Sequence, residues 1–147
     1  MIATGGVDRV VRVFDLRSAG TTTVAGLPNT GLGAGLGGAN VVSELRGHEY
    51  AIRKVAWSPH WAGVLMSGGY DMSVRIWEDG LEQNPGAGGM GGMGRLKGVF
   101  DKHTEFVAGL DWCLFGGEGW AASTGWDEAV WVWDANSVVS AAGMGRR

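Results

Sequence analysis

The sequence is poor in cysteine, in proline and in long apolar runs. Its one cysteine, Cys113, has no second thiol in the chain, so a disulfide-stabilised scaffold is excluded. No stretch approaches the ~18 consecutive apolar residues of a membrane helix, and no charged and then apolar leader begins the chain. The net charge of −3 provides no basic field for nucleic acid. We therefore expect a soluble intracellular protein that neither inserts into a membrane nor binds nucleic acid.

Residues for catalysis or metal binding are also sparse. No two of the Cys and His residues have zinc-finger spacing, and Cys113 has neither a His nor a Cys near it in the sequence. We interpret it as a structural thiol and His60 as a surface residue. The segment GAGLGG at 33–38 matches a dinucleotide fingerprint, but no strand leads into it and no amphipathic helix follows. The sequence therefore predicts no enzyme, no metal site and no cofactor.

What the chain does have is an excess of glycine, eight tryptophans and a repeat. VDRVVRVFD at 7–15 returns as YDMSVRIWE at 70–78 and as WDEAVWVWD at 126–134. Each copy has a hydroxyl residue four places before its Asp and an aromatic residue six places after it. In two copies a His precedes the Asp by 23 or 24 places. In chain order these residues are Thr4, Asp8, Phe14; His48, Ser67, Asp71, Trp77; and His103, Ser123, Asp127, Trp133.

The segments within each repeat alternate in the manner of β-strands. VRVF, VRIW and VWVW have period two and are rich in β-branched and aromatic residues. Each unit then consists of a His, two strands joined by the Asp turn to a third, an acidic residue and a fourth strand. This pattern resembles the WD-repeat β-propeller, an all-β fold of four-stranded antiparallel blades.

The resemblance implies that a hydrogen-bonded tetrad holds each blade together. The Trp indole donates to the Ser hydroxyl, the hydroxyl meets the His ring, and the His meets the Asp. The two complete tetrads are then His48–Ser67–Asp71–Trp77 and His103–Ser123–Asp127–Trp133. The first copy is incomplete, because Phe14 has no N–H to donate and the chain has no His at the matching place.

The repeat spacing predicts two and a half to three blades of a probable seven, and so a partial propeller over 1–147. We expect a blade part at 1–47, a blade at 48–102, a blade at 103–135 without its last strand, and a tail at 136–147. Gly-rich loops at 18–40 and 79–94 interrupt the first two units. Starting inside a blade indicates a chain whose first blades are absent.

A propeller usually presents a rigid face, and here its predicted residues are aromatic and acidic. They lie after each His and before each Asp: Glu49, Tyr50, Tyr70, Glu105, Phe106 and Trp126. Exposed aromatic residues on a rigid scaffold are typical binding anchors, and acids favour a basic ligand. The alternative is that Tyr70 and Trp126 only pack between neighbouring blades.

A closer resemblance rests on longer motifs. GHEYAIRKV with SPH, YDMSVRIW, HTEF with GLDW, and TGWDE are similar to the last two blades of peroxisomal import receptors for type-2 targeting signals. The chain departs from the usual repeat at Phe14, at Glu78 in place of Asp, and at Lys102 in place of Gly.

This resemblance implies a cargo receptor without catalytic activity. Such a receptor binds the N-terminal, helical, basic and Leu-containing signal of its cargo in the cytosol. It acts with a co-receptor and a peroxisomal docking complex, and it shuttles between the cytosol and the peroxisome matrix. The six aromatic and acidic residues would contact the signal. The alternative function is a general WD-repeat scaffold in a chromatin or ubiquitin-ligase assembly.

Overall fold

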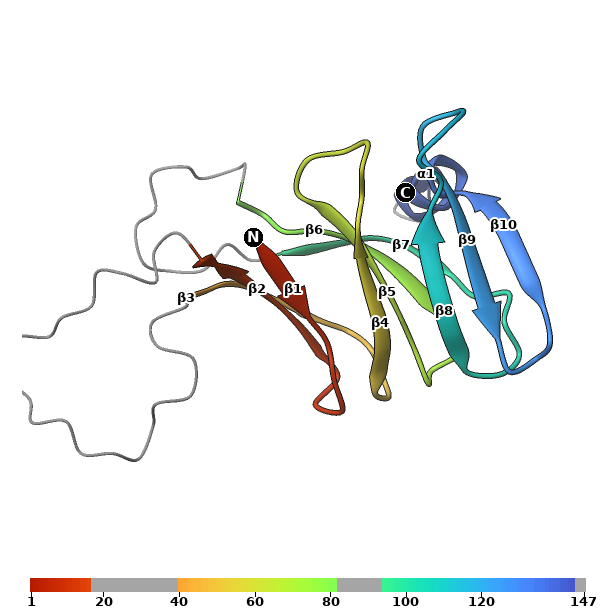
Figure 1. Cartoon of the computed structure of the whole chain (residues 1–147), viewed down its shortest axis with the longest axis horizontal. Coiled ribbons are helices and arrows are strands. Elements are labelled where there is room, and N and C mark those ends of the chain that lie inside the picture. Colours follow the sequence, from red (N-terminus) through yellow and green to blue (C-terminus); the bar gives the residue numbers. More distant parts are fainter. Residues whose placement is uncertain (17–39, 82–93, 145–147) are drawn as a thin grey trace, which may run out of the picture.

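The computed structural model describes residues 1–16, 40–81 and 94–144. Within these residues the chain forms ten strands and one helix, and the strands make three antiparallel sheets. The sheets lie side by side in chain order, as successive blades of a propeller do (Figure 1). The all-β, WD-repeat propeller fragment expected from the sequence is confirmed. Nearly all of the two Gly-rich loops lies outside the described residues.

The first and third sheets have three strands each. The first has the order β1–β2–β3, with β1 (Ile2–Thr4), β2 (Val10–Asp15) and β3 (Asn40–Arg46). The third has the order β10–β9–β8, with β8 (Val107–Trp112), β9 (Trp120–Gly125) and β10 (Val130–Asp134). In both sheets consecutive strands are neighbours, which is the simplest antiparallel arrangement.

The second sheet has four strands, in the order β4–β5–β6–β7. They are β4 (Ile52–Trp57), β5 (Val64–Gly69), β6 (Val74–Glu78) and β7 (Arg95–Phe100). Strand β4 carries a register shift between Ile52 and Lys54, and β8 carries one at the matching place, between Val107 and Gly109. The two innermost strands therefore share an irregularity as well as a sequence pattern.

Each sheet has the same tight turn after its repeated Asp. The residues that follow the Asp are Arg9, Met72 and Glu128, and their φ angles are 65°, 61° and 60°. A non-glycine residue in this left-handed region is uncommon. Three copies of the same exception show that the three repeats fold alike, although one of them has no complete set of tetrad residues.

The core consists of two apolar clusters, each between neighbouring sheets. One contains Val11, Val13 and Leu45 of the first sheet together with Leu65 and Trp77 of the second. The other lies between the second and third sheets and contains Met66, Val74, Ile76, Phe100, Val107, Leu110, Trp112, Ala121 and Trp133. Burying these side chains is the main favourable contribution to the packing of one sheet on the next.

Helix α1 (Ala135–Met144) follows β10 directly. It packs on β7, where Val138 lies so close to Gly98 that a Cβ atom on this glycine would be 2.9 Å from a methyl group of Val138. The sequence analysis described 136–147 only as a tail. The helix covers part of the cluster between the second and third sheets, because Val138 and Val139 pack against it.

Candidate functional site

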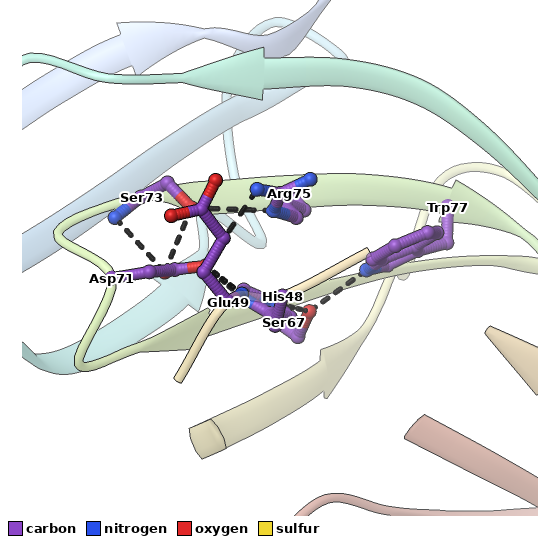
Figure 2. A network of polar contacts seen from close by, with 7 residues as sticks. All are labelled: His48, Glu49, Ser67, Asp71, Ser73, Arg75 and Trp77. Carbon is purple, nitrogen blue, oxygen red and sulfur yellow. Dashed lines mark hydrogen bonds and ion pairs between the residues drawn. The ribbon is translucent and has the colours of Figure 1, made fainter. Parts of the chain in front are cut away.

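A chain of hydrogen bonds joins the four tetrad side chains of the second sheet, and Figure 2 shows it from close by. We call this chain of hydrogen bonds the staple. The Trp77 indole N–H donates to the Ser67 hydroxyl at 2.7 Å. The hydroxyl in turn lies 2.7 Å from His48 Nε2, and His48 Nδ1 lies 2.8 Å from Asp71 Oδ2. These four side chains come from β6, β5, the segment before β4 and the turn after β5. The chain of bonds therefore connects the whole Asp turn to the start of the sheet.

One arrangement of protons satisfies every polar atom of this network. The Ser67 oxygen accepts from Trp77, and its own proton is available to donate to His48 Nε2. With the ring proton on Nδ1, Nε2 accepts from Ser67 and Nδ1–H donates to the Asp71 carboxylate. Every polar atom along the chain has a partner with the neutral imidazole.

Asp71 also organises the backbone around it. One carboxylate oxygen accepts from the Glu49 backbone N–H at 3.1 Å, and the other accepts from the Ser73 hydroxyl at 2.9 Å. Burial alone would raise the pKa of Asp71, but the bonds from His48, Ser73 and Glu49 outweigh it and lower the pKa to about 2. The Arg75 guanidinium lies 3.6 Å from the same carboxylate and places a positive charge beside it.

The third sheet repeats the staple. Its three contacts join Trp133 to Ser123 at 3.2 Å, Ser123 to His103 at 2.9 Å, and His103 to Asp127 at 2.9 Å. Burial would raise the pKa of the Asp127 carboxyl, but bonds from the Thr104 backbone and the His103 ring lower it overall. Phe100 of β7 stacks on the Trp133 ring with centroids 4.5 Å apart, a contact that the repeat pattern gave no reason to expect.

The staples hold in place the turns that carry the predicted binding residues. Asp71 fixes the backbone of Glu49, and Asp127 fixes that of Thr104, next to Glu105. Further along, the Trp126 backbone N–H donates to the Phe106 carbonyl at 2.9 Å. The Tyr70 N–H makes the matching 2.9 Å bond to the carbonyl of Ala51. The residue before each Asp is therefore locked against the segment that follows each His.

Three of the predicted residues form a contiguous aromatic ladder, which we define as Tyr70, Phe106 and Trp126. The Tyr70 and Phe106 rings stack with centroids 4.8 Å apart, across the boundary between the second and third sheets. Phe106 and Trp126 have centroids 5.5 Å apart. Tyr70 is 37% exposed and Trp126 is 67% exposed, so the ladder packs between the sheets and also presents ring surface to solvent.

The remaining predicted residues lie beside the ladder in sequence but do not join it. Glu49, Tyr50 and Glu105 are exposed. In the described part of the chain, the Tyr50 ring contacts no other ring, and neither glutamate side chain forms an ion pair. Their carboxylates are available to a basic ligand. No group of three or more potential metal ligands occurs in the described ranges, and no described helix is long and apolar enough to cross a membrane.

At the ends of the strands that lie away from the Asp turns, a contact that the sequence analysis missed links the second and third sheets. His60, expected at the surface, is only partly exposed, and its Nε2 lies 2.8 Å from the Cys113 carbonyl oxygen. Beside it, Trp61 meets the Trp112 ring edge to face at 5.8 Å. No local sequence signal connects residues 53 places apart, so only the packing of the sheets could show this contact.

Comparison with known proteins agrees with this geometry. The family model for the WD domain, G-beta repeat, matches residues 39–78. The peroxisomal targeting signal 2 receptor of Saccharomyces cerevisiae is 40% identical over an alignment of 141 residues that covers 91% of this chain and 37% of the receptor. Peroxisome biogenesis protein 7 of Arabidopsis thaliana is 39% identical over 89 residues, 60% of this chain and 24% of that protein. The probable cytosolic iron-sulfur protein assembly protein 1 of Candida glabrata is 26% identical over 145 residues, 92% and 34% of the respective chains. The matched regions thus span between about a quarter and a little over a third of the length of these relatives.

Proposed function

We propose, from the premise that this chain carries WD repeats and is similar to peroxisomal targeting signal 2 receptors, that it is part of such a receptor and contributes to the surface that contacts the signal. The observation that carries the proposal is the 40% identity to the yeast receptor over 91% of the chain. The region of identity includes both stapled His–Asp turns and the aromatic ladder between them.

The proposed mechanism is recognition without catalysis. The ladder offers aromatic surface to the Leu side chains of an amphipathic signal helix, and Glu49 and Glu105 offer carboxylates to its basic residues. Because hydrogen bonds to the Asp71 and Asp127 carboxylates fix the turns that carry these residues, little conformational entropy is lost when the signal binds. Trp126 is the most exposed ring of the ladder, and we therefore expect it to be the main anchor.

The partners and the location belong to the same proposal. The receptor would take cargo with a type-2 signal in the cytosol, act with a co-receptor and the peroxisomal docking complex, and shuttle into the peroxisome matrix. The chain would contribute the partial propeller at 1–147, with blades at 1–47, 48–102 and 103–135. Because the yeast relative is far longer than the matched region, we expect that the isolated chain does not bind a signal peptide, and micromolar binding would contradict this.

A chimera tests the proposal. This chain replaces the matching segment of the Saccharomyces cerevisiae receptor, and the purified chimera is titrated with a fluorescent type-2 signal peptide. We expect binding that disappears when a Leu of the signal is changed to Asp. Trp126→Ala should weaken binding by at least about tenfold, the loss typical of an aromatic anchor.

Phe115→Ala is the matched control. Phe115 is 84% exposed and lies in the loop between β8 and β9, at the other end of these strands from Trp126. It should leave the affinity unchanged. A chimera that folds but does not bind the peptide, and that captures a multi-subunit assembly instead, would favour the alternative WD-repeat scaffold. The weaker similarity to the iron-sulfur assembly relative supports the scaffold alternative.

A further inference from the structure

The two boundaries between neighbouring sheets differ at one repeated position. We call the boundary between the first and second sheets the first boundary, and that between the second and third sheets the second boundary. The residue three places after the tetrad His is Ala51 in the second sheet and Phe106 in the third. The same position of the repeat therefore carries a methyl group in one unit and a phenyl ring in the next.

The backbone at these two residues is alike. The Ala51 carbonyl accepts the Tyr70 N–H and the Phe106 carbonyl accepts the Trp126 N–H, both at 2.9 Å. Two places before each of them, a backbone N–H donates to the Asp of the staple, at 3.1 Å in the second sheet and 3.0 Å in the third. The strands that follow begin with the same register shift. The Ala51 side chain therefore leaves the backbone in the direction that Phe106 takes, toward the preceding sheet.

The Phe106 ring fills the second boundary near the surface. It lies between Tyr70, at 4.8 Å, and Trp126, at 5.5 Å, measured between ring centroids. The counterparts of these two flanking residues at the first boundary are Val7 and Tyr70. Val7 is 87% exposed, and in the described chain Tyr70 has a ring contact only on the side of Phe106. No described ring therefore occupies the place beside Ala51 that corresponds to Phe106.

The first boundary is nevertheless closed one residue further along the chain. The Ile52 N–H donates to the Gly6 carbonyl at 3.0 Å, and a Cβ atom on Gly5 would be 2.6 Å from a methyl group of Ile52. The first two sheets therefore touch directly next to Ala51, which is itself partly exposed. The missing ring leaves apolar surface between the sheets and does not open the core.

We propose that the first boundary takes a leucine side chain of the bound signal helix, inserted beside Ala51 and between Val7 and Tyr70. The inference rests on the proposed function and adds to it the residue that selects this side chain. An isobutyl group is smaller than the phenyl ring that fills the matching place at the second boundary, so it fits where that ring would fit. Ala51 is the determinant, because a larger residue there would fill the place itself.

The charge beside Ala51 identifies the occupant. Glu49 stands two residues earlier in the same turn, is exposed, and forms no ion pair among the described residues. A basic side chain that meets this carboxylate lies within one helical turn of the leucine, because residues three or four apart share a face of a helix. We therefore expect the inserted leucine to be the one nearest to a basic residue of the signal. A wholly apolar segment would leave the Glu49 carboxylate without a partner.

The two boundaries then have different roles in recognition. The second boundary is already filled by Phe106, so it offers aromatic surface on which a helix can lie. The first boundary accepts one side chain of limited size. Selectivity for leucine over larger residues therefore comes from the first boundary.

The test uses the yeast chimera with substitutions at Ala51 and a series of signal peptides in which each Leu is changed singly to Ala. Ala51→Phe places in the first boundary the residue that the second boundary already holds, and Ala51→Leu adds less volume. Ala51→Ser is the matched control, because serine adds almost no volume. Peptide affinity is measured by fluorescence titration, and the urea midpoint of each free chimera reports its folding.

Ala51→Phe should lower the affinity for the unmodified peptide at least about tenfold, Ala51→Leu should lower it less, and Ala51→Ser should leave it within about twofold. In the unmodified chimera, removing the inserted leucine should also cost at least about tenfold. In Ala51→Phe the same peptide change should cost less than about threefold, because the place is already filled. The changes at the other Leu positions should keep their full effect.

The outcomes separate this inference from the proposed function. If the chimera binds the peptide and Trp126→Ala weakens binding, but Ala51→Phe does not, only the inference is overturned. It is also overturned if Ala51→Phe weakens every peptide by the same factor, or if it lowers the urea midpoint without changing the ranking of the peptides. The last result would mean that another part of the receptor fills the first boundary. A folded chimera that binds no signal peptide overturns the proposed function and this inference with it.

Discussion

The first and second sheets build the same turn with different side chains around it. Asp8 and Asp71 occupy the same place, and the residues after them have nearly the same left-handed conformation. Yet the Asp8 side chain is 47% exposed and pairs with Arg12, whereas the Asp71 side chain is 4% exposed and pairs with His48. The turn itself does not need the staple. The staple buries the Asp side chain and connects the turn to the segment before β4.

The two networks also point in different directions. Arg12 bridges Asp8 to Glu44, and so links β2 outward to β3. Asp71 reaches through His48 and Ser67 to Trp77, and so links the turn inward through the buried part of the sheet. The third sheet shows that Arg at this place is not part of the staple. It has the complete tetrad, and Trp131 stands where the others have Arg12 and Arg75.

The comparison of the two sheets is tested most strongly by replacing each aspartate singly with alanine. Asp71→Ala should lower the free energy of unfolding by about 3 kcal/mol, because the buried His48 ring loses its carboxylate partner and the Glu49 N–H loses its acceptor. Asp8→Ala should have a far smaller effect, since Asp8 and Arg12 are both hydrated. Urea unfolding followed by tryptophan fluorescence measures both. Similar losses in the two variants would show that the staple contributes no more than the surface pair.

The next largest difference between the first and second sheets is expected in how their Asp residues make stability depend on pH. The pKa of Asp71 is about 2 in the folded chain against an ordinary 3.8, so the unfolded chain takes up the proton first as the pH falls. This contribution is present above pH 3.8 and is lost progressively as the pH falls towards 2. Asp8, Glu44 and Asp127 have lowered pKa values too, and therefore add slope of the same sign.

Asp71→Asn provides the measurement of this effect. The substitution removes one titrating group, so acid unfolding should be less steep between pH 4 and pH 2 than in the unmodified chain. Asp8→Asn should change the slope less, because the surface pair with Arg12 is screened by salt. Equal slopes for the unmodified chain and Asp71→Asn would contradict the assignment of the lowered pKa to the staple.

The smallest effect is expected from an attempt to convert the first sheet into the second. Phe14→Trp adds the missing indole, but there is no His for the Thr4 hydroxyl to meet, and Thr4 itself is exposed. The unfolding free energy should change by less than about 0.5 kcal/mol. The reverse change, Trp77→Phe, should cost about 1 kcal/mol or more, because it removes a buried hydrogen bond to Ser67. A large gain from Phe14→Trp would mean that the indole alone makes the staple.

Much of the second and third sheets follows from spacing in the sequence. The intervals between His48, Ser67, Asp71 and Trp77 recur at His103, Ser123, Asp127 and Trp133, and the structure joins both sets by hydrogen bonds. The resemblance to the WD-repeat fold implied which of these side chains pair, and the pairing is favourable because buried polar groups need hydrogen-bond partners.

Other features had no sequence signal. Helix α1 follows the last strand with neither an acidic first turn nor a basic last turn, and it is held by its contact with β7. The stacking of Phe106 between Tyr70 and Trp126, and the bond from His60 to the Cys113 carbonyl, join residues of different repeats. A repeat pattern describes one unit, and it says nothing of which side chains meet across the boundary between two units.

The sequence by itself determined the unit: its strands, its Asp turn and the four side chains that pair within it, because these depend on local alternation and on polar groups that must be satisfied inside one sheet. Only the tertiary structure decided how the units meet. It placed the aromatic ladder across a boundary between sheets, and it paired the Trp112 indole while leaving that of Trp57 without an acceptor in the described chain. The physical reason is that packing between sheets depends on the distance and orientation of whole strands, which are fixed only when the neighbouring sheet is in place.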